Sequence, residues 1–250
     1  MKKPSKSPSE NTSRSAKAPG KPARVPVHKG PSGEIRLIGG HWKRIKLKVA
    51  DRPGLRPTPD RVRETLFNWL GQDLHGMRCI DAFAGTGALG FEAASRGAAE
   101  VLLVEHDSAL VVQLQRVQAQ LLALVLPEAA APQKLHILRG EGVATLRQLA
   151  PASYDVIFLD PPFDGDLYAP ALTAAARALA ANGFIYLEGP KAWTDAMLEP
   201  MGLVVSRHLK AGSVHAHVLR AAAVVSAAQL TQSPGAPNAN PRNCCLPRHL

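Results

Sequence analysis

The stretch Tyr154-Asp155-Val156-Ile157-Phe158-Leu159-Asp160-Pro161-Pro162-Phe163 decides the fold. It begins as an apolar run, the pattern of a strand that is buried on both faces of a parallel sheet. Neither proline can donate a hydrogen bond to a neighbouring strand, and Pro161 favours an extended conformation at Asp160. The strand is therefore predicted to end at Asp160, in a stiff turn that presents a carboxylate, free carbonyl groups and the ring of Phe163.

Strand and helix patterns alternate on both sides of this stretch, across residues 78–220, which indicates a parallel α/β sheet. The last two predicted strands are joined by only four residues, Lys210 to Ser213, and so short a link makes them antiparallel. The other strands are predicted at Arg78–Asp81, Glu100–Glu105, Leu135–Leu138, Asp155–Leu159 and Phe184–Leu187, with the final pair at Leu203–Leu209 and Val214–Arg220. The helices are predicted to begin near Ala88, Ser108, Val143, Leu167 and Trp193.

Ligands of open α/β sheets bind beyond the carboxyl ends of the strands. The turn at Asp160, Pro161, Pro162 and Phe163 places hydrogen-bond acceptors beside a flat ring at such an end. This combination suits a planar base that carries an amino group, and the four residues are the predicted catalytic residues.

A small N-terminal extension is predicted before the sheet, at residues 34–72. Apolar and basic residues alternate from Arg44 to Val49, which indicates a β-hairpin with one apolar and one basic face. A helix should start at Thr58-Pro59-Asp60, with Thr58 as its cap, and end at Gly71. We expect RNA contacts from this extension, at Arg36, Trp42, Lys43, Arg44, Lys46, Arg56, Arg61 and Arg63. A solvated basic face that discourages strand aggregation is the alternative.

Basic residues are concentrated in the N-terminal quarter of the chain. Residues 1–63 hold 17 of the 30 Lys and Arg residues, although the whole chain carries a net charge of only +10. This asymmetry predicts a polyanionic partner at the N-terminal end, or else a tail that keeps the protein soluble. We expect residues 1–33 to be a disordered basic tail, residues 73–222 to be the main domain and residues 223–250 to be a second disordered tail.

Hydropathy and cysteine content bound the location of the protein. No apolar run is long enough for a membrane span, and the N-terminus has no apolar signal core. The three cysteines give neither a disulfide framework nor metal-ligand spacing. A cytoplasmic protein without a metal site or a membrane partner is expected.

The segment Asp81–Gly90 follows the first sheet strand and contains G-x-G-x-x-G at Gly85, Gly87 and Gly90. Such a loop permits close approach of the backbone to a cofactor, and taken alone it would suggest a nicotinamide dinucleotide. The carboxylate of Asp81 favours S-adenosyl-L-methionine instead, since it would repel a pyrophosphate and attract a cationic amino acid group. The remaining candidate cofactor residues are Phe83, Thr86, Glu105 for the ribose hydroxyls and Glu141 for the adenine amine.

These stretches resemble a known family. The turn at residues 160–163, after a glycine loop, resembles the (Asn/Asp/Ser)-Pro-Pro-(Tyr/Phe/Trp) motif of methyltransferases that modify amino groups of nucleic acids. Arg36–Gly40 with Trp42, Arg56–Leu70 and Asp81–Gly90 together resemble, more narrowly, the RsmD family of bacterial 16S ribosomal RNA guanine-N(2) methyltransferases. The resemblance extends over residues 35–220.

The resemblance implies a Rossmann-like class I methyltransferase, with a mostly parallel seven-stranded sheet and a terminal antiparallel strand. It implies a monomeric enzyme that methylates a guanine, numbered 966 in the family, of 16S ribosomal RNA within the small subunit or its assembly intermediate. Asp81, Gly85, Gly87 and Glu105 would hold the cofactor, and Asp160 to Phe163 the base. Gly140-Glu141-Gly142 departs from the aspartate followed by alanine that the family pattern leads us to expect.

Two other functions are compatible with the residues. The turn at Asp160 fits any exocyclic amine, so a DNA adenine or cytosine amino methyltransferase is one alternative. A ribosome-associated RNA-binding protein with a catalytically idle methyltransferase fold is the other.

Overall fold

The computed structural model describes residues 33–48, 58–124, 134–163 and 166–222. Their main sheet has seven strands in the order β5-β4-β3-β6-β7-β9-β8. The strands are β3 (Arg78–Asp81), β4 (Glu100–Glu105), β5 (Lys134–Arg139), β6 (Tyr154–Leu159), β7 (Leu179–Gly189), β8 (Leu203–Ala211) and β9 (Val214–Ala221). Four neighbouring pairs are parallel, from β5 through to β7, whereas β9 pairs antiparallel with both β7 and β8. The predicted fold class is confirmed.

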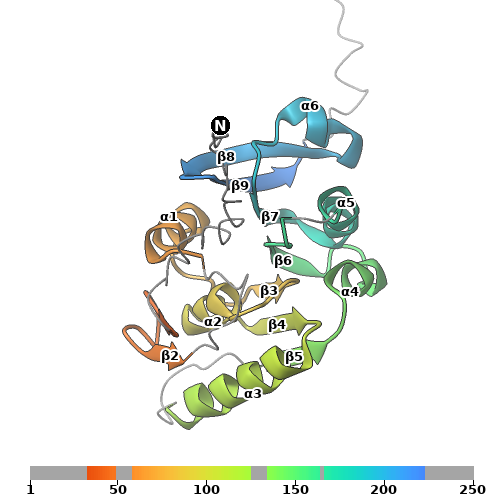
Figure 1. The fold of residues 1–250 in the computed structure, drawn as a ribbon. Helices are drawn as coiled ribbons and strands as arrows, with labels where there is room; N and C mark the ends of the chain where they lie inside the picture. The colour runs from red at the N-terminus through yellow and green to blue at the C-terminus, as the bar shows by residue number, and fades with distance from the viewer. Residues whose placement is uncertain (1–32, 49–57, 125–133, 164–165, 223–250) are drawn as a thin grey trace, which may run out of the picture. The chain divides into compact units, whose positions relative to one another are not determined.

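Helices cover both faces of this sheet (Figure 1). One face carries α1 (Asp60–Leu70), α2 (Ala88–Ser95) and α3 (Ser108–Ala123), and the other carries α4 (Gly142–Gln148), α5 (Tyr168–Ala178) and the short α6 (Asp195–Leu198), which runs into a 3-10 turn at Glu199–Met201. Each face has its own apolar core, centred on Phe67, Phe91 and Phe158 on the first side and on Leu146, Ile157 and Leu172 on the second. The helices are therefore held by burial on the sheet.

The chain starts the parallel sheet at β3 and builds outward through β4 to β5. It then returns to the other side of β3 with β6, followed by β7. The boundary between β3 and β6 is thus the point where the strand order reverses, which is where open α/β sheets bind ligands. The glycine loop follows β3 and the Asp160 turn follows β6, so the two predicted motifs meet at this boundary.

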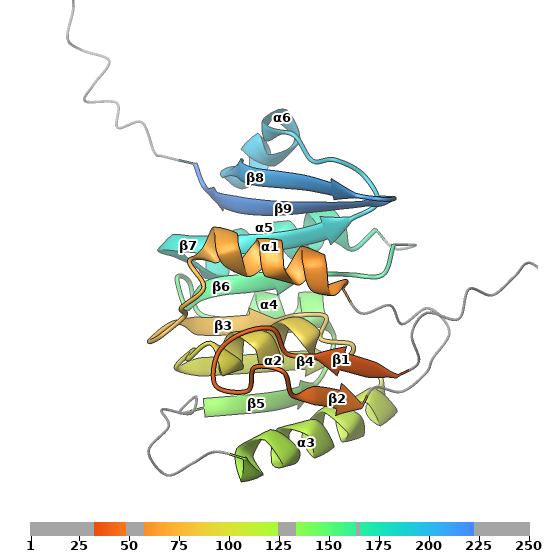
Figure 2. The same ribbon diagram turned by 90° about the vertical axis from the view of Figure 1, so that its left-hand side faces the viewer.

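The N-terminal hairpin consists of β1 (Glu34–Arg36) and β2 (Lys46–Lys48), and it lies against α2 (Figure 2). The backbone nitrogens of His41 and Trp42 donate to the carbonyl and hydroxyl of Ser95 at 2.7 and 2.9 Å. Gly40 has a φ of +72°, and a Cβ there would stand 1.7 Å from the Ser95 carbonyl oxygen. The hairpin tip therefore requires glycine in order to dock on α2.

Helix α1 confirms the predicted apolar stripe and the end at Gly71, which adopts a left-handed conformation with φ of +100°. Its predicted cap is wrong. Pro59 occupies the cap position, and no side chain caps the helix. The hydroxyl of Thr58 instead bonds to Glu188 at the end of β7. Every helix in the described ranges is too short or too polar to cross a lipid bilayer.

Candidate active site

Four neighbouring strands each contribute one acid at the switch point. Asp81 ends β3, Glu105 ends β4, Asp160 directly follows β6, and Glu188 is the penultimate residue of β7. The register pairs Leu159 with Leu187, so the next residues, Asp160 and Glu188, are neighbours. Asp81 pairs with Phe158 and Leu103, each two residues before an acid of its own strand. Because side chains alternate along a strand, all four acids belong to one face.

Two of these acids shape the glycine loop. The Asp81 carboxylate is 2 % exposed and accepts from the backbone N–H of Gly90 at 3.0 Å. The Glu105 carboxylate accepts from the backbone N–H groups of Gly85 and Asp107, both at 2.8 Å. The loop is therefore held at both ends before a cofactor arrives, and it connects β3 directly to α2.

The central acids have perturbed ionisation. Burial raises the pKa of Asp81 to about 7, with added repulsion from Glu105 and against hydrogen bonds from Gly90 and the Phe83 backbone. Burial, then repulsion from Glu188 and Asp81, raise the pKa of Asp160 well above its usual value of 3.8. Adjacent carboxylates in low dielectric disfavour their shared ionisation. A bound cation would therefore stabilise the ionised forms of this row of four acids.

Glu188 was not among the predicted site residues. It is 5 % exposed, accepts from the Tyr186 hydroxyl at 2.8 Å and also bonds to the Thr58 hydroxyl. Burial raises the pKa of Glu188, while the two hydroxyl donors lower it. A signal was present, since Phe184–Leu187 is an apolar run that stops at an acid and a glycine, much as the β6 run stops at Asp160.

The residues present fit S-adenosyl-L-methionine better than a dinucleotide. No described Lys or Arg forms an ion pair with Asp81, Asp160 or Glu188. A pyrophosphate beside these acids would be repelled, whereas the sulfonium and ammonium groups of the methyl donor would be attracted. The donor set and the glycine loop are therefore suited to a cationic nucleoside.

The remaining predicted cofactor residues have different surroundings. Thr86 and Gly87 are buried in the loop, and Phe83 is half-buried with its ring edge against Gly142, where a Cβ would stand 2.9 Å away. Glu141 is exposed at the start of α4 and caps no backbone group there.

The base-binding turn presents a ring to solvent. Phe163 is 48 % exposed, whereas Pro161 is buried and Asp160 is half-buried. Of the predicted RNA-contacting residues, the exposed ones are Arg36, Lys43, Arg44, Lys46 and Arg61. Arg56 lies outside the described residues, as do the two predicted tails apart from Gly33.

The structure corrects the prediction for Trp42 and Arg63. Trp42 is 2 % exposed and belongs to the core beneath the hairpin, so its ring offers no surface to RNA. Arg63 is 1 % exposed and pairs with Asp60 at 2.6 Å and with the fully buried Glu92 at 3.5 Å. Both residues hold the N-terminal extension to the domain instead of facing a ligand.

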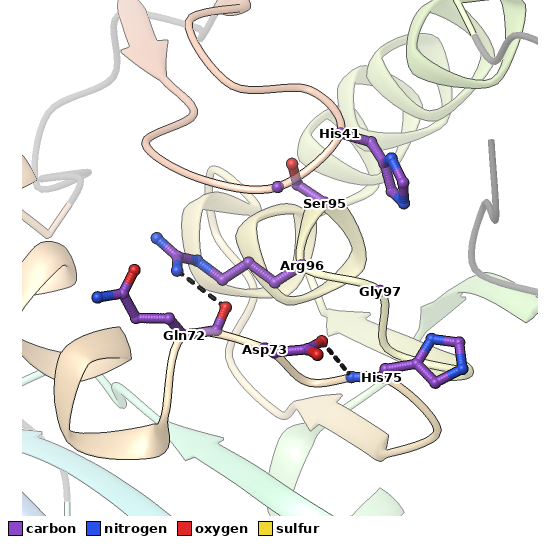
Figure 3. Close-up of a pocket in the computed structure, with 8 residues that line it drawn as sticks. His41, Gln72, Asp73, His75, Ser95, Arg96 and Gly97 are labelled. Carbon is purple, nitrogen blue, oxygen red and sulfur yellow. Dashed lines mark hydrogen bonds between the residues drawn. The ribbon is translucent and has the colours of Figure 1, made fainter.

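Two other candidates among the described residues, a surface pocket and a metal site, have less support than the row of acids. A surface pocket lies at the opposite end of the strands, where β3 and β4 begin (Figure 3). Its lining residues are Gly40, His41, Gln72, Asp73, His75, Ser95, Arg96 and Gly97. Its buried cation, Arg96, is already bonded to Glu92 and to the Gln72 carbonyl. In the described part of the chain, His, Cys, Asp and Glu side chains form no group of three suited to a metal ion.

Comparisons with known proteins agree with this geometry. The family model described as Conserved hypothetical protein 95 matches residues 35–220. The chain is 42 % identical over 162 residues to ribosomal RNA small subunit methyltransferase D of Escherichia coli. The aligned region covers 65 % of this chain and 74 % of the relative. It is 37 % identical over 186 residues to the protein of that name from Haemophilus influenzae, covering 70 % and 93 %.

Solved structures give the same result. The protein yhhF of Escherichia coli, described as a methyltransferase, matches with a TM-score of 0.63 and 35 % identity, over 76 % of this chain and 99 % of that one. The matched region contains the glycine loop, the row of acids and the Asp-Pro-Pro-Phe turn. Fold and family together imply S-adenosyl-L-methionine as the methyl donor. The chain belongs to the RsmD family of methyltransferases.

Proposed function

We propose that the protein transfers a methyl group from S-adenosyl-L-methionine to the exocyclic N2 amine of a guanine in small-subunit ribosomal RNA. The observation that carries the proposal is the Asp160-Pro161-Pro162-Phe163 turn, which lies at the switch point beside the glycine loop. Relatives named for small-subunit ribosomal RNA support the substrate class. The choice of guanine N2 rests on the sequence resemblance.

The chemistry needs a better nucleophile than a free guanine amine, whose lone pair is delocalised into the ring. The Asp160 carboxylate and the Pro161 carbonyl accept hydrogen bonds from the amine, which draws its hydrogens out of the plane and localises the lone pair on nitrogen. Both hydrogen bonds strengthen as positive charge develops on that nitrogen, so they stabilise the transition state more than the bound substrate.

When bound, S-adenosyl-L-methionine supplies an electrophilic methyl group on a sulfonium. Asp81, Glu105 and the glycine loop would hold this donor. Its methyl carbon would bond to the amine nitrogen as the carbon–sulfur bond broke, with the electron pair of that bond left on a neutral thioether. The amine then loses one proton, which Asp160 accepts. Because nitrogen, carbon and sulfur must be in line, the rigid ends of β3 and β6 contribute chiefly by positioning.

Phe163 supplies the surface on which the base stacks. Its ring is 48 % exposed at the turn, which distinguishes it from the core aromatic residues. Stacking of this kind contributes about 1–3 kcal/mol per base. A guanine in structured RNA must first be splayed out, at a cost of about a few kcal/mol, and stacking on Phe163 offsets part of that cost.

The basic residues of the extension other than the buried Arg63 would contact the RNA backbone. The partner would be ribosomal RNA in the small subunit or an assembly intermediate, with the enzyme acting as a monomer. The proposed contacts are Arg36, Lys43, Arg44, Lys46, Arg56 and Arg61. Since phosphate contacts release counterions, RNA affinity should fall steeply with added salt. An affinity that does not respond to salt would favour a merely solvated basic face.

One experiment tests the function directly. The protein is incubated with labelled S-adenosyl-L-methionine and small subunits that lack the modification, and the digested RNA is analysed for methylated nucleosides. Label in N2-methylguanosine is the expected result, and Asp160→Ala is the control for contaminating activity. Label only in methylated adenine or cytosine of DNA offered in parallel would favour the DNA alternative. Binding of subunits without any transfer would favour the idle fold.

A further inference from the structure

Glu188 and Asp160 form a pair that the methylation chemistry above does not require. They extend the registered pair Leu159 and Leu187 by one residue on adjacent parallel strands, and so they share one face of the sheet. Asp160 is the acid that meets the target amine, and its turn leaves it half-buried. Glu188 is 5 % exposed and lies beside it on β7.

The Glu188 carboxylate is fixed from two sides. Tyr186, two residues earlier on β7, donates its hydroxyl at 2.8 Å, and Thr58 donates from the segment that precedes α1. Both hydroxyls act as donors to this acid, and hydrogen bonds to the charged form of a carboxylate stabilise that form. The two hydroxyl donors therefore hold the buried Glu188 carboxylate in place and stabilise its ionised form.

The charge faces a cluster without a described basic partner. The titratable groups around Glu188 are Asp160 on β6, Tyr186 on its own strand and Tyr168 on α5, with Asp81 on β3 as a further neighbour of Asp160. None of the described Lys and Arg residues forms an ion pair with Glu188. The Glu188 carboxylate is therefore held in place without a basic partner among the described residues, and a bound cation would stabilise its ionised form.

We propose that Glu188 is a positioning residue whose fixed charge makes the site prefer the sulfonium form of the cofactor to its neutral thioether product. The inference rests on the proposed function in one respect, namely that the target amine is held by Asp160. Because the transferred methyl lies between that amine and the sulfur, the sulfur lies close to Asp160 and to its neighbour Glu188. Coulomb attraction at this range acts on the substrate cofactor and vanishes for the product.

The expected consequence is that the product form of the cofactor leaves the site more easily than the donor form. A site that relied on adenosine and amino acid contacts alone would hold both forms of the cofactor equally, and the product would inhibit. With an anion beside the sulfur, loss of the methyl group removes the attraction at the moment of transfer. Glu188 thus contributes to release of the product without touching the base.

Calorimetric titration of the full chain with S-adenosyl-L-methionine and with S-adenosylhomocysteine, without RNA, tests the proposal at pH 8. The measured quantity is the ratio of the two dissociation constants. In Glu188→Gln the preference for the sulfonium form should fall about tenfold, mainly through weaker binding of the donor. Glu188→Asp, which keeps the charge, should restore most of the preference. A merely structural role predicts equal weakening of both ligands, and an unchanged ratio in Glu188→Gln overturns the inference.

A second variant keeps the test decisive if Glu188→Gln does not fold. Tyr186→Phe retains the acid but removes one of its two donors, so Glu188 should ionise at a higher pH. The preference for the sulfonium form should then develop at higher pH than in the wild type. Identical pH profiles for the two proteins contradict the inference. If the wild type binds neither ligand, the proposed function fails as well, whereas binding with an unchanged ratio removes only the role of Glu188.

Discussion

Two buried acids on the same side of the sheet have opposite surroundings. Glu92 on α2, beneath the hairpin, is fully buried, accepts hydrogen bonds from Arg96 and the backbone nitrogens of Ile38 and Gly39, and forms an ion pair with Arg63 at 3.5 Å. Glu188 at the switch point is 5 % exposed, and its donors are two neutral hydroxyls, with Asp160 as an acidic neighbour.

The difference separates a structural charge from a functional one. Around Glu92, two arginines and two N–H groups complete the coordination, so the charge is neutralised and the extension is locked to α2. Around Glu188 and Asp160 the charge is left for a ligand to neutralise. Buried charges require partners, and a site that lacks a protein partner is where a cationic ligand binds best.

The largest expected effect concerns Glu92 and the two arginines that pair with it, Arg63 and Arg96. Glu92→Ala leaves two arginines buried without their shared partner, which typically costs about 3–5 kcal/mol. The free energy of unfolding, measured by urea titration, should fall by this amount, and Glu64→Ala on the exposed side of α1 serves as the matched control. A loss no larger than that of the control would mean that the network does not hold the extension.

Asp160→Ala should act on chemistry while the fold persists. Removal of one electrostatic contact to a transition state lowers turnover by about 10²–10³-fold, and the measured rate of methyl transfer should fall at least that far. Binding of S-adenosyl-L-methionine should survive, because Asp81 and Glu105 still hold the glycine loop. Near wild-type transfer would remove Asp160 from the mechanism.

Phe163→Ala should weaken RNA binding with little effect on stability. The exposed ring contributes stacking of about 1–3 kcal/mol, so the KM for RNA should rise about 5- to 100-fold while the urea midpoint stays constant. Trp42→Ala is the matched contrast, since that buried ring should affect unfolding instead. Unchanged KM and rate in Phe163→Ala would exclude a stacking role.

The smallest effect, counted per pH unit, is a change in the slope of the unfolding free energy with pH. Burial raises the pKa of Asp81 from its usual 3.8 to about 7. Below about pH 4 both the folded and unfolded states are protonated there, and between about pH 4 and 7 only the unfolded state ionises freely. Stability should therefore fall as pH rises through this window, by up to about 1.4 kcal/mol per pH unit from this group.

Asp81→Asn removes the titrating group while keeping an oxygen that can accept from Gly90. Urea titrations between pH 4 and 7 should show a shallower decline in this variant than in the wild type. Equal slopes would show that Asp81 is ionised throughout the window in the folded protein.

Much of the fold follows from local pattern. The Asp160-Pro161-Pro162 run ends β6 because proline cannot continue a ladder, and the predicted strands at Arg78–Asp81 and Glu100–Glu105 match β3 and β4 residue for residue. The short link at residues 210–213 sets the antiparallel end of the sheet. In each case the cause lies within a few residues of the effect.

The residues that sequence patterns misplaced depend on contacts across the fold. Alternation gives the hairpin two faces, but only the position of α2 decides that Trp42 and Arg63 are covered. Thr58 has the chemistry of a helix cap, and its hydroxyl was redirected because β7 ends beside it.

The sequence by itself therefore determined the strands, the glycine loop and the acids Asp81, Glu105 and Asp160, because these are properties of short segments. Only the tertiary structure decided which acids stand together. The register of β6 on β7 joins Asp160 to Glu188, and the fold of the extension brings Arg63 to Glu92. Charge neutralisation depends on distances between segments far apart in the chain, and local pattern does not contain those distances.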